Sequence, residues 1–372
     1  MKILIKLNHP AHYHLFKNFI KQMKDRHYIK VLIRDKDILS DLLEIDEVEY
    51  ERIIESKKRS RGNKFSILFA NLREMLEQDI NLFRHIKDYR YDILMGTDIS
   101  ISHIGRIFKI PSFIFNEDDF EINKMFCSTT YPYCDFIVSP SVCSVGKFGK
   151  KKIEYDGYQK LAYLHPNYFT PDIRTVNKYI NSDKPFFILR LVSYTAGHDI
   201  EQKHGGISEE LLETLISILL KKGNVYLTSE ENLKDKFKKH LLKINPIDIH
   251  HLLAFSDLLI TDSQSMTVEA AMLGTPSIRY NSFVGKISVL NEIENRYHLS
   301  TGIHINESDK LLKQVNEIVE NKDTKSLYLN NRNRMLDDKA DLTAFLIWLI
   351  EDFPNSVMNN RLSDIYNKFR SE

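Results

Sequence analysis

Cysteine is scarce in this sequence, and neither sign of charge is in excess. Cys127, Cys134 and Cys143 are the only cysteines, and no two of them are spaced as C-x-x-C. We therefore expect neither a disulfide framework nor a cysteine-based zinc site, and a reducing cytoplasm fits best. Lysine and arginine together number 52 against 51 acidic residues. Because nucleic-acid-binding proteins carry a basic excess, we expect no nucleic-acid partner.

Long apolar runs are missing as well. The apolar part of the opening MKILIKLNHP is too short for a signal peptide, and no run approaches the roughly 20 apolar residues of a membrane span. Two basic segments, ESKKRSRGNKF at 55–65 and KFGKKK at 147–152, leave peripheral contact with a membrane open. We predict a soluble cytoplasmic protein, either free or at the inner face of the membrane. No internal repeat is present, which excludes solenoid and propeller folds.

What the sequence does have is a regular alternation of short apolar runs and amphipathic stretches. The runs predict strands at 2–7, 30–34, 92–96, 111–115 and 135–140, and again at 185–191, 224–229, 257–263 and 276–280. Alternation of this kind is typical of parallel sheets with helices on both faces. We predict two such domains, 1–165 and 166–345, and C-terminal helices over 346–372 that pack back toward the first domain.

The most informative stretch is LLITDSQSMTVEAAMLGTPSIRY, residues 258–280. A buried strand ends in a polar turn, and a helix start follows, with free backbone N–H groups and a positive dipole end that suit a diphosphate. Ser263 and Ser265 are small enough for close approach, and Glu269 has a carboxylate for a ribose diol. The alternative is that a serine merely caps the helix and Glu269 lies on a solvated face.

This motif resembles the nucleotide-sugar motif of GT-B fold proteins. With NHPAHYHLFKNFI, YDGYQKLAYLHP, ILRLVSYTAGHD and FVGKISVLNEIENRYHL, nearly the whole chain resembles an uncharacterised family of archaeal and bacterial GT-B-like proteins, and more distantly UDP-N-acetylglucosamine 2-epimerases. The resemblance implies the GT-B variety of the α/β class, with two Rossmann-like domains facing across a cleft. It also implies that Glu269 binds the ribose and that the donor diphosphate is bound by Ser263, Gln264, Ser265 and Met266.

Two residues near the start of the second domain are further candidates for the donor site. Arg190 lies at the end of a predicted strand, where a guanidinium can bind a diphosphate bidentately and stabilise a leaving nucleotide. His198 lies in a glycine-containing loop that follows. The alternatives are a surface ion pair for Arg190 and an ordinary loop position for His198.

In a GT-B enzyme the first domain holds the acceptor, and its strand ends supply candidate bases. His12 and His14 follow the first strand, Asp98 follows a later one, and Glu117 follows the next. A histidine or carboxylate there can take the proton from an attacking hydroxyl, although helix caps are the alternative reading for the acids. His12 and His14 are two residues apart and point to different sides of a helix, so we predict no metal site.

The predicted function is that of a glycosyltransferase, moving a sugar from a nucleotide-sugar donor to a surface-polysaccharide or glycoconjugate acceptor. The acceptor would be a glycan or lipid-linked, and the donor, expected to be UDP-linked, is a substrate, so no cofactor is predicted. One alternative is an epimerase that uses Asp98 and Glu117 as paired carboxylates. Its characteristic loop with arginine, proline and glutamate is replaced here by NHPAHYH. A non-catalytic nucleotide-sugar-binding protein is the other alternative.

Overall fold

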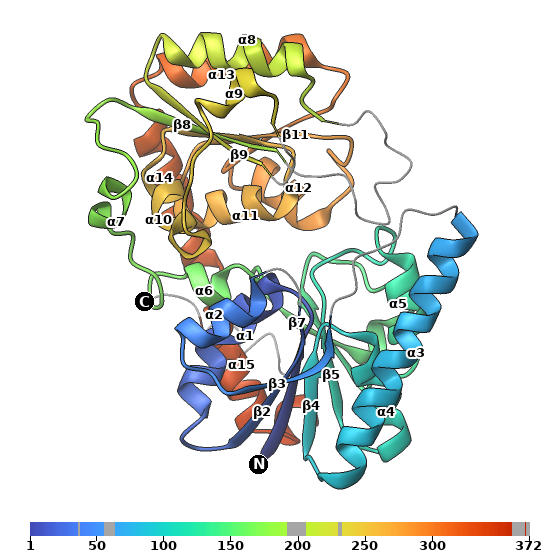
Figure 1. The fold of residues 1–372 in the computed structure, drawn as a ribbon. Helices are drawn as coiled ribbons and strands as arrows, with labels where there is room; N and C mark the ends of the chain where they lie inside the picture. The colour runs from blue at the N-terminus through green and yellow to red at the C-terminus, as the bar shows by residue number, and fades with distance from the viewer. Residues whose placement is uncertain (36–37, 56–63, 192–205, 230–232, 359–368, 370–372) are drawn as a thin grey trace. The chain divides into compact units, whose positions relative to one another are not determined.

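The computed structural model describes the chain except for residues 36–37, 56–63, 192–205, 230–232, 359–368 and 370–372 (Figure 1). The described chain forms two compact units. Unit 1 contains Met1–Tyr163 and Lys339–Ser371, and unit 2 contains Leu164–Asp338. The chain therefore leaves unit 1 once and returns to it.

Unit 1 is built on a seven-stranded sheet in the order β3-β2-β1-β4-β5-β6-β7. All of its strand pairs are parallel. The order reverses between β1 and β4, so the switch point of the sheet lies at the carboxyl ends of these two strands. The strands are β1 Lys2–Leu7, β2 Tyr28–Asp35, β3 Tyr50–Glu55, β4 Ile93–Gly96, β5 Ser112–Phe115, β6 Phe136–Pro140 and β7 Lys152–Tyr155.

Helices cover both faces of this sheet (Figure 1). Alternate strand residues such as Leu4, Leu94 and Ile137 pack under α3, α4 and α5, while α1 packs against α2 and α15 on the other face. The helices are α1 Pro10–Met23, α2 Leu39–Ile45, α3 Lys64–Asp88, α4 Ile99–Phe108, α5 Lys124–Thr130, α6 Leu161–Leu164, α15 Leu342–Glu351 and α16 Asn355–Met358, with a 3₁₀ turn at Gly146–Lys151.

Unit 2 is built on a five-stranded parallel sheet in the order β12-β11-β10-β8-β9, with its switch point between β8 and β10. Its core joins the sheet to α8 and α13. The strands are β8 Phe186–Leu191, β9 Asn224–Ser229, β10 Leu258–Thr261, β11 Ser277–Tyr280 and β12 Thr301–Ile303. The helices are α7 Ile173–Asn177, α8 Glu209–Leu220, α9 Asp235–Lys238, α10 Ile249–Phe255, α11 Gln264–Leu273, α12 Ser288–Asn295, α13 Ser308–Glu320 and α14 Thr324–Asp338.

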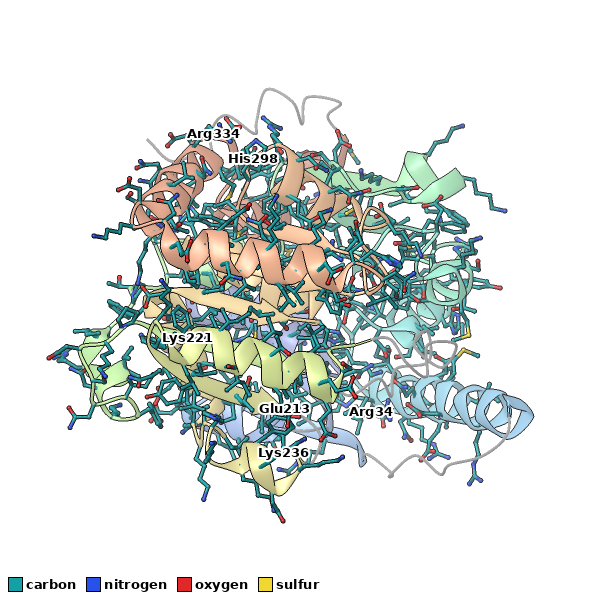
Figure 2. The ribbon with its side chains drawn as sticks, turned by 90° about the horizontal axis from the view of Figure 1, so that it is seen from above. Arg34, Glu213, Lys221, Lys236, His298 and Arg334 are labelled. Atoms are coloured by element: carbon teal, nitrogen blue, oxygen red, sulfur yellow. The ribbon has the colours of Figure 1, made fainter. Side chains whose placement is uncertain are left out.

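Ion pairs on the outer surface of unit 2 link neighbouring helices. Lys236 of α9 pairs with Glu209 and, at 2.6 Å, with Glu213, both on α8 (Figure 2). Such exposed pairs contribute little stability, so the apolar core beneath them must hold these helices.

The predicted class of two parallel-sheet α/β domains is confirmed. One further strand of the first sheet, β7, was not predicted, and it pairs with β6. The described helices include none long and apolar enough to cross a membrane.

Candidate functional site

Polar side chains gather at the switch point of each sheet, where ligands bind in open parallel α/β folds. In unit 2, Arg190 of β8 lies beside Thr261 of β10 in the strand register, and α11 begins directly after β10. In unit 1, His12 follows β1 and Thr97 follows β4. Each unit therefore has a polar set of its own.

The start of α11 is a complete N-cap at the end of β10. The Ser263 hydroxyl accepts a hydrogen bond from the Met266 N–H at 3.2 Å, and the Ser263 N–H donates to the Thr261 hydroxyl at 2.9 Å. The helix therefore starts at Gln264, so that Ser265 lies in its first turn. Since Met266 N–H serves the cap, the helix start offers an anion the N–H groups of Gln264 and Ser265.

A buried arginine and an asparagine brace this turn from the neighbouring strand. The amide nitrogen of Asn281 donates to the carbonyl of Asp262 at 3.1 Å, and the amide oxygen of Asn281 accepts from the Arg279 guanidinium at 2.8 Å. Arg279 is fully buried and makes an ion pair with Glu294. The turn that begins α11 is therefore held rigidly before any ligand arrives.

Glu269 lies on α11 between one and two turns beyond the Ser263 cap, and a histidine from α10 approaches it. His250 Nε2 is 3.5 Å from Glu269 Oε1, and both side chains are largely buried. Phe169 packs edge-on against His250. This approach places the Glu269 carboxylate on the side of α11 that faces α10. His250 was not predicted as a site residue, because no spacing in the sequence connects α10 with α11.

Arg190 is the second-to-last residue of β8 and is half-buried. It stands level with Thr261 on one side and Thr228 of β9 on the other. The strand register therefore brings Arg190 to the edge where α11 begins, as the sequence predicts. His198 lies outside the described residues, within 192–205.

In unit 1, α1 begins at the switch point with His9 as its N-cap and Pro10 in its first turn. His12 bridges the two strand ends: its Nδ1 is 2.6 Å from the Thr97 hydroxyl and accepts the Asn8 N–H at 3.4 Å. A nitrogen that accepts carries no proton, so the neutral ring carries its proton on Nε2. His12 is therefore suited to donate a hydrogen bond through Nε2.

Asp98 is a buried carboxylate whose oxygens are taken by protein donors. It caps α4 by accepting from the Ser100 N–H at 2.9 Å, receives Lys6 Nζ at 2.6 Å, and accepts from Asn8 and the Ser100 hydroxyl. Burial alone would raise the pKa of Asp98, but the Lys6 charge and these hydrogen bonds outweigh burial and lower it. A carboxylate held in this way is a poor proton acceptor near neutral pH.

The remaining candidates of unit 1, His14 and Glu117, contact residues of the segment 159–163, at which the chain leaves that unit. The His14 ring stacks on Tyr163, with ring centroids 4.9 Å apart. Glu117 follows β5 and accepts the Gln159 N–H at 2.6 Å, with Lys160 Nζ at 3.4 Å. Within the part of the chain that the structure describes, no three histidine, cysteine or acidic side chains form a group that could hold a metal ion.

The family model "Protein of unknown function (DUF354)" matches residues 1–351. The chain belongs to this family. No curated protein matches its sequence.

Solved structures match both units of this DUF354 chain at low identity. A UDP-N-acetylglucosamine 2-epimerase, described as putative, from Listeria monocytogenes is 14% identical, with a TM-score of 0.67 over 97% of this chain and 98% of that one. The Neisseria meningitidis UDP-GlcNAc 2-epimerase bound to UDP-GlcNAc is 13% identical, with a TM-score of 0.62 over 97% and 100%. A spinosyn rhamnosyltransferase complexed with its aglycone is 9% identical, with a TM-score of 0.59 over 95% and 100%. The likeness establishes the GT-B kind of fold.

Proposed function

We propose that this chain is a glycosyltransferase whose unit 2 binds a nucleotide-sugar donor and whose unit 1 activates a hydroxyl of a glycan or lipid-linked acceptor. The observation that carries the proposal is the polar set at each switch point: Arg190 with the start of α11 in one sheet, and His12 with Thr97 in the other. The structural neighbour bound to UDP-GlcNAc supports a UDP-linked donor.

Donor binding would use both backbone and side-chain groups of unit 2. The N–H groups of Gln264 and Ser265 and the Arg190 guanidinium would bind the diphosphate, since each is cationic or lies at a positive helix end. Glu269, held by His250, would accept two hydrogen bonds from the ribose diol. The same diphosphate groups would stabilise the charge that develops as the nucleotide leaves.

His14 is the proposed base, because it lies on α1, the helix that begins at the unit 1 switch point, and its ring is positioned by stacking on Tyr163. Asp98 is held by Lys6, Ser100 and Asn8, and His12 Nδ1 already accepts hydrogen bonds. Glu117 is bound to a backbone N–H and to a lysine. In the proposed step the acceptor hydroxyl gives its proton to His14, its oxygen bonds to the anomeric carbon, and the bond from that carbon to the diphosphate oxygen breaks.

Epimerase chemistry needs acid and base groups that exchange protons with the sugar. Asp98 would have to be one of them, and its lowered pKa and internal partners oppose that role. Its position supports instead a part in holding α4 and the β1 strand end in place.

The binding part of the proposal is tested by calorimetry with UDP. We expect Glu269→Gln and Arg190→Ala each to weaken UDP binding about tenfold or more, because each removes hydrogen bonds from a charged group. Glu213→Gln and Arg174→Ala, which change exposed residues on α8 and α7, are the matched controls. Unchanged affinity in both site variants contradicts the donor site.

The catalytic part is tested by product analysis with UDP-, GDP- and dTDP-sugars, with and without oligosaccharide and polyprenyl phosphate acceptors. Transfer that depends on an acceptor, and that His14→Gln abolishes while UDP affinity is kept, is the expected result. An isomerised nucleotide sugar formed without acceptor would identify an epimerase instead.

A further inference from the structure

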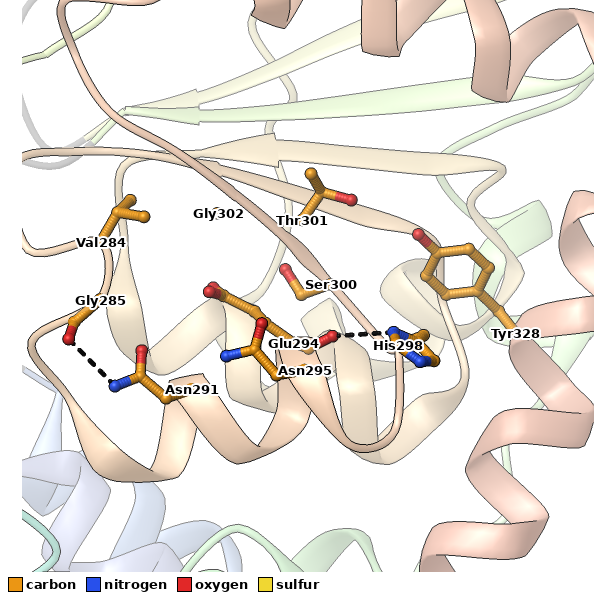
Figure 3. Close-up of a pocket in the computed structure, with 10 residues that line it drawn as sticks. All are labelled: Val284, Gly285, Asn291, Glu294, Asn295, His298, Ser300, Thr301, Gly302 and Tyr328. Atoms are coloured by element: carbon orange, nitrogen blue, oxygen red, sulfur yellow. Dashed lines mark hydrogen bonds between the residues drawn. The ribbon is translucent and has the colours of Figure 1, made fainter.

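A pocket of about 330 Å³ lies at the edge of the unit 2 sheet (Figure 3). It is bordered by α12 and the loop that follows it, by β12, and by Tyr328 of α14. Among the described residues that line it, none belongs to the β8–β10 switch point. Its volume is at the lower end of the range for small-molecule sites, about 300–1,000 Å³.

A carboxylate forms one side of the pocket, and the sheet edge is shaped around it. Glu294 Oε1 accepts two hydrogen bonds from Arg279, at 2.7 and 3.1 Å. The other oxygen, Oε2, lies against Gly302 of β12, where a Cβ would come within 2.5 Å of it. Glycine is therefore needed at 302 for the carboxylate to lie along the strand, and the described chain provides no hydrogen-bond donor to Oε2.

The other polar groups of the pocket present donors and acceptors side by side. His298 Nδ1 donates to the Glu294 carbonyl at 3.1 Å, so Nε2 of the neutral ring is an acceptor. Asn291 donates to the Gly285 carbonyl at 3.1 Å and keeps its amide oxygen as an acceptor. Burial raises the pKa of Tyr328, so its hydroxyl stays protonated and can donate. Figure 3 shows Asn291 toward one end of this space and His298 and Tyr328 toward the other.

Charge in this pocket is balanced. Arg279 neutralises Glu294, and its guanidinium is fully buried and hydrogen-bonded to Glu294 and Asn281. None of the described residues that line the pocket is a lysine or an arginine. A phosphate or carboxylate ligand would therefore meet Glu294 Oε2 without a cation to offset it, and burying an unpaired charge is costly.

We propose that this pocket binds a neutral monosaccharide, either free or as one unit of a glycan. Each hydroxyl of a sugar both donates and accepts, which matches the mixed donors and acceptors around the space, and Glu294 Oε2 is an acceptor for a sugar hydroxyl. The pocket is a second sugar site, distinct from the one at the β8–β10 switch point, and it does not depend on the proposed transfer reaction.

Protein hydrogen bonds connect this pocket to the turn before α11, next to the proposed diphosphate site. Glu294 binds Arg279, Arg279 binds Asn281, and Asn281 donates to the Asp262 carbonyl just before α11. A sugar on Glu294 Oε2 would thus sit at one end of a buried network whose other end is the start of α11.

Saturation-transfer NMR on the full chain tests the proposal, with glucose, galactose and N-acetylglucosamine as neutral probes and glucose 6-phosphate as the charged one. The spectra are recorded with saturating UDP, so that the switch-point site is filled. Two further polar residues line the pocket, Thr301 of β12 and Asn295 of α12. We expect at least one neutral sugar to bind, and Thr301→Val and Asn295→Ala each to weaken that binding about five-fold through loss of a hydrogen bond. Thr214→Val, an exposed position on α8, is the control and should bind normally.

Two results would overturn the proposal: no signal from any neutral sugar in the presence of UDP, or equal binding in wild type and both pocket variants. Preference for glucose 6-phosphate would also refute it, since the pocket would then favour an anion. If the chain binds the sugar but not UDP, the pocket proposal stands and the donor-site proposal fails. If it binds UDP but no neutral sugar, the pocket proposal fails and the donor-site proposal stands.

Discussion

Lys6 and Asp98 form the most buried ion pair of unit 1, with exposures of 0% and 5%. Breaking such a pair from one side leaves an uncompensated charge, whereas replacing both partners removes the charge altogether. We predict that Asp98→Asn destabilises unit 1 by about 3–5 kcal/mol. In the double variant Lys6→Met, Asp98→Asn most of that loss should be recovered.

Urea unfolding followed by circular dichroism measures both variants. A single variant as stable as wild type, or a double variant no better than the single one, would show that the pair does not stabilise the unit.

The pair also shows what the sequence could not reveal about single residues. Asp98 was predicted as a candidate base because it follows a strand, and that placement is what the structure has. Its partner Lys6 lies 92 residues earlier, in a run that otherwise looks like an ordinary buried strand. Only the register of β1 with β4, which sets Lys6 level with Gly96, brings the two together.

At the scale of elements, one imidazole on α4 makes hydrogen bonds to both α3 and α5. His103 of α4 has Nδ1 2.8 Å from the Asp79 carboxylate of α3 and Nε2 2.9 Å from the Thr129 carbonyl of α5. Both nitrogens face acceptors, which favours the doubly protonated ring. The hydrogen bond to Asp79 raises the pKa of His103 above its ordinary 6.5, although burial opposes the shift.

Because the folded-state pKa is the higher one, His103 stabilises the fold fully below its unfolded pKa of 6.5, and the effect is lost as pH rises through the folded value. We predict that His103→Gln costs more stability at about pH 5.5 than at about pH 8.5. Urea unfolding at both pH values measures this. In an Asp79→Asn background the difference between the two pH values should shrink. An equal cost at both pH values would contradict the role of the imidazolium.

All central strands were predictable from the sequence, whereas of the four edge strands only β9 was predicted. Runs such as ILIKL and LLIT are buried on both faces, so they read as continuous apolar segments. The strands that the sequence analysis missed, β3, β7 and β12, all lie at sheet edges. KIEY of β7 and TGI of β12 are short, and β3 and β7 carry charged residues, since an edge faces water.

At the start of α11, the elements were predictable from the sequence, but the contacts between them were not. The strand, the polar turn and the helix were all predicted from 258–280, and each is present. Which serine caps the helix was left open, and the structure assigns it to Ser263. The brace from Asn281 was not predicted, because it depends on β11 lying beside β10.

At the scale of the whole molecule, each unit should respond to its own perturbation. Leu349 of α15 is fully buried in unit 1, so Leu349→Ala should cost about 2–5 kcal/mol there. UDP should stabilise unit 2 by mass action. Hydrogen exchange read by mass spectrometry separates the two, because peptides from 164–338 report on unit 2 alone.

The expected pattern is faster exchange in unit 1 of Leu349→Ala, and slower exchange in unit 2 of either protein once UDP is added. UDP protection confined to unit 1 would contradict the donor assignment. Faster exchange spread evenly over both units of Leu349→Ala would show that they unfold together.

The return of the chain to unit 1 has a consequence for its biosynthesis. Lys339, buried against Asp156 and Tyr158, and the apolar face of α15 belong to unit 1 but are translated after all of unit 2. When the amino-terminal part of unit 1 leaves the ribosome, it still lacks residues of its own core, and that core can be completed only after 164–338 has been synthesised.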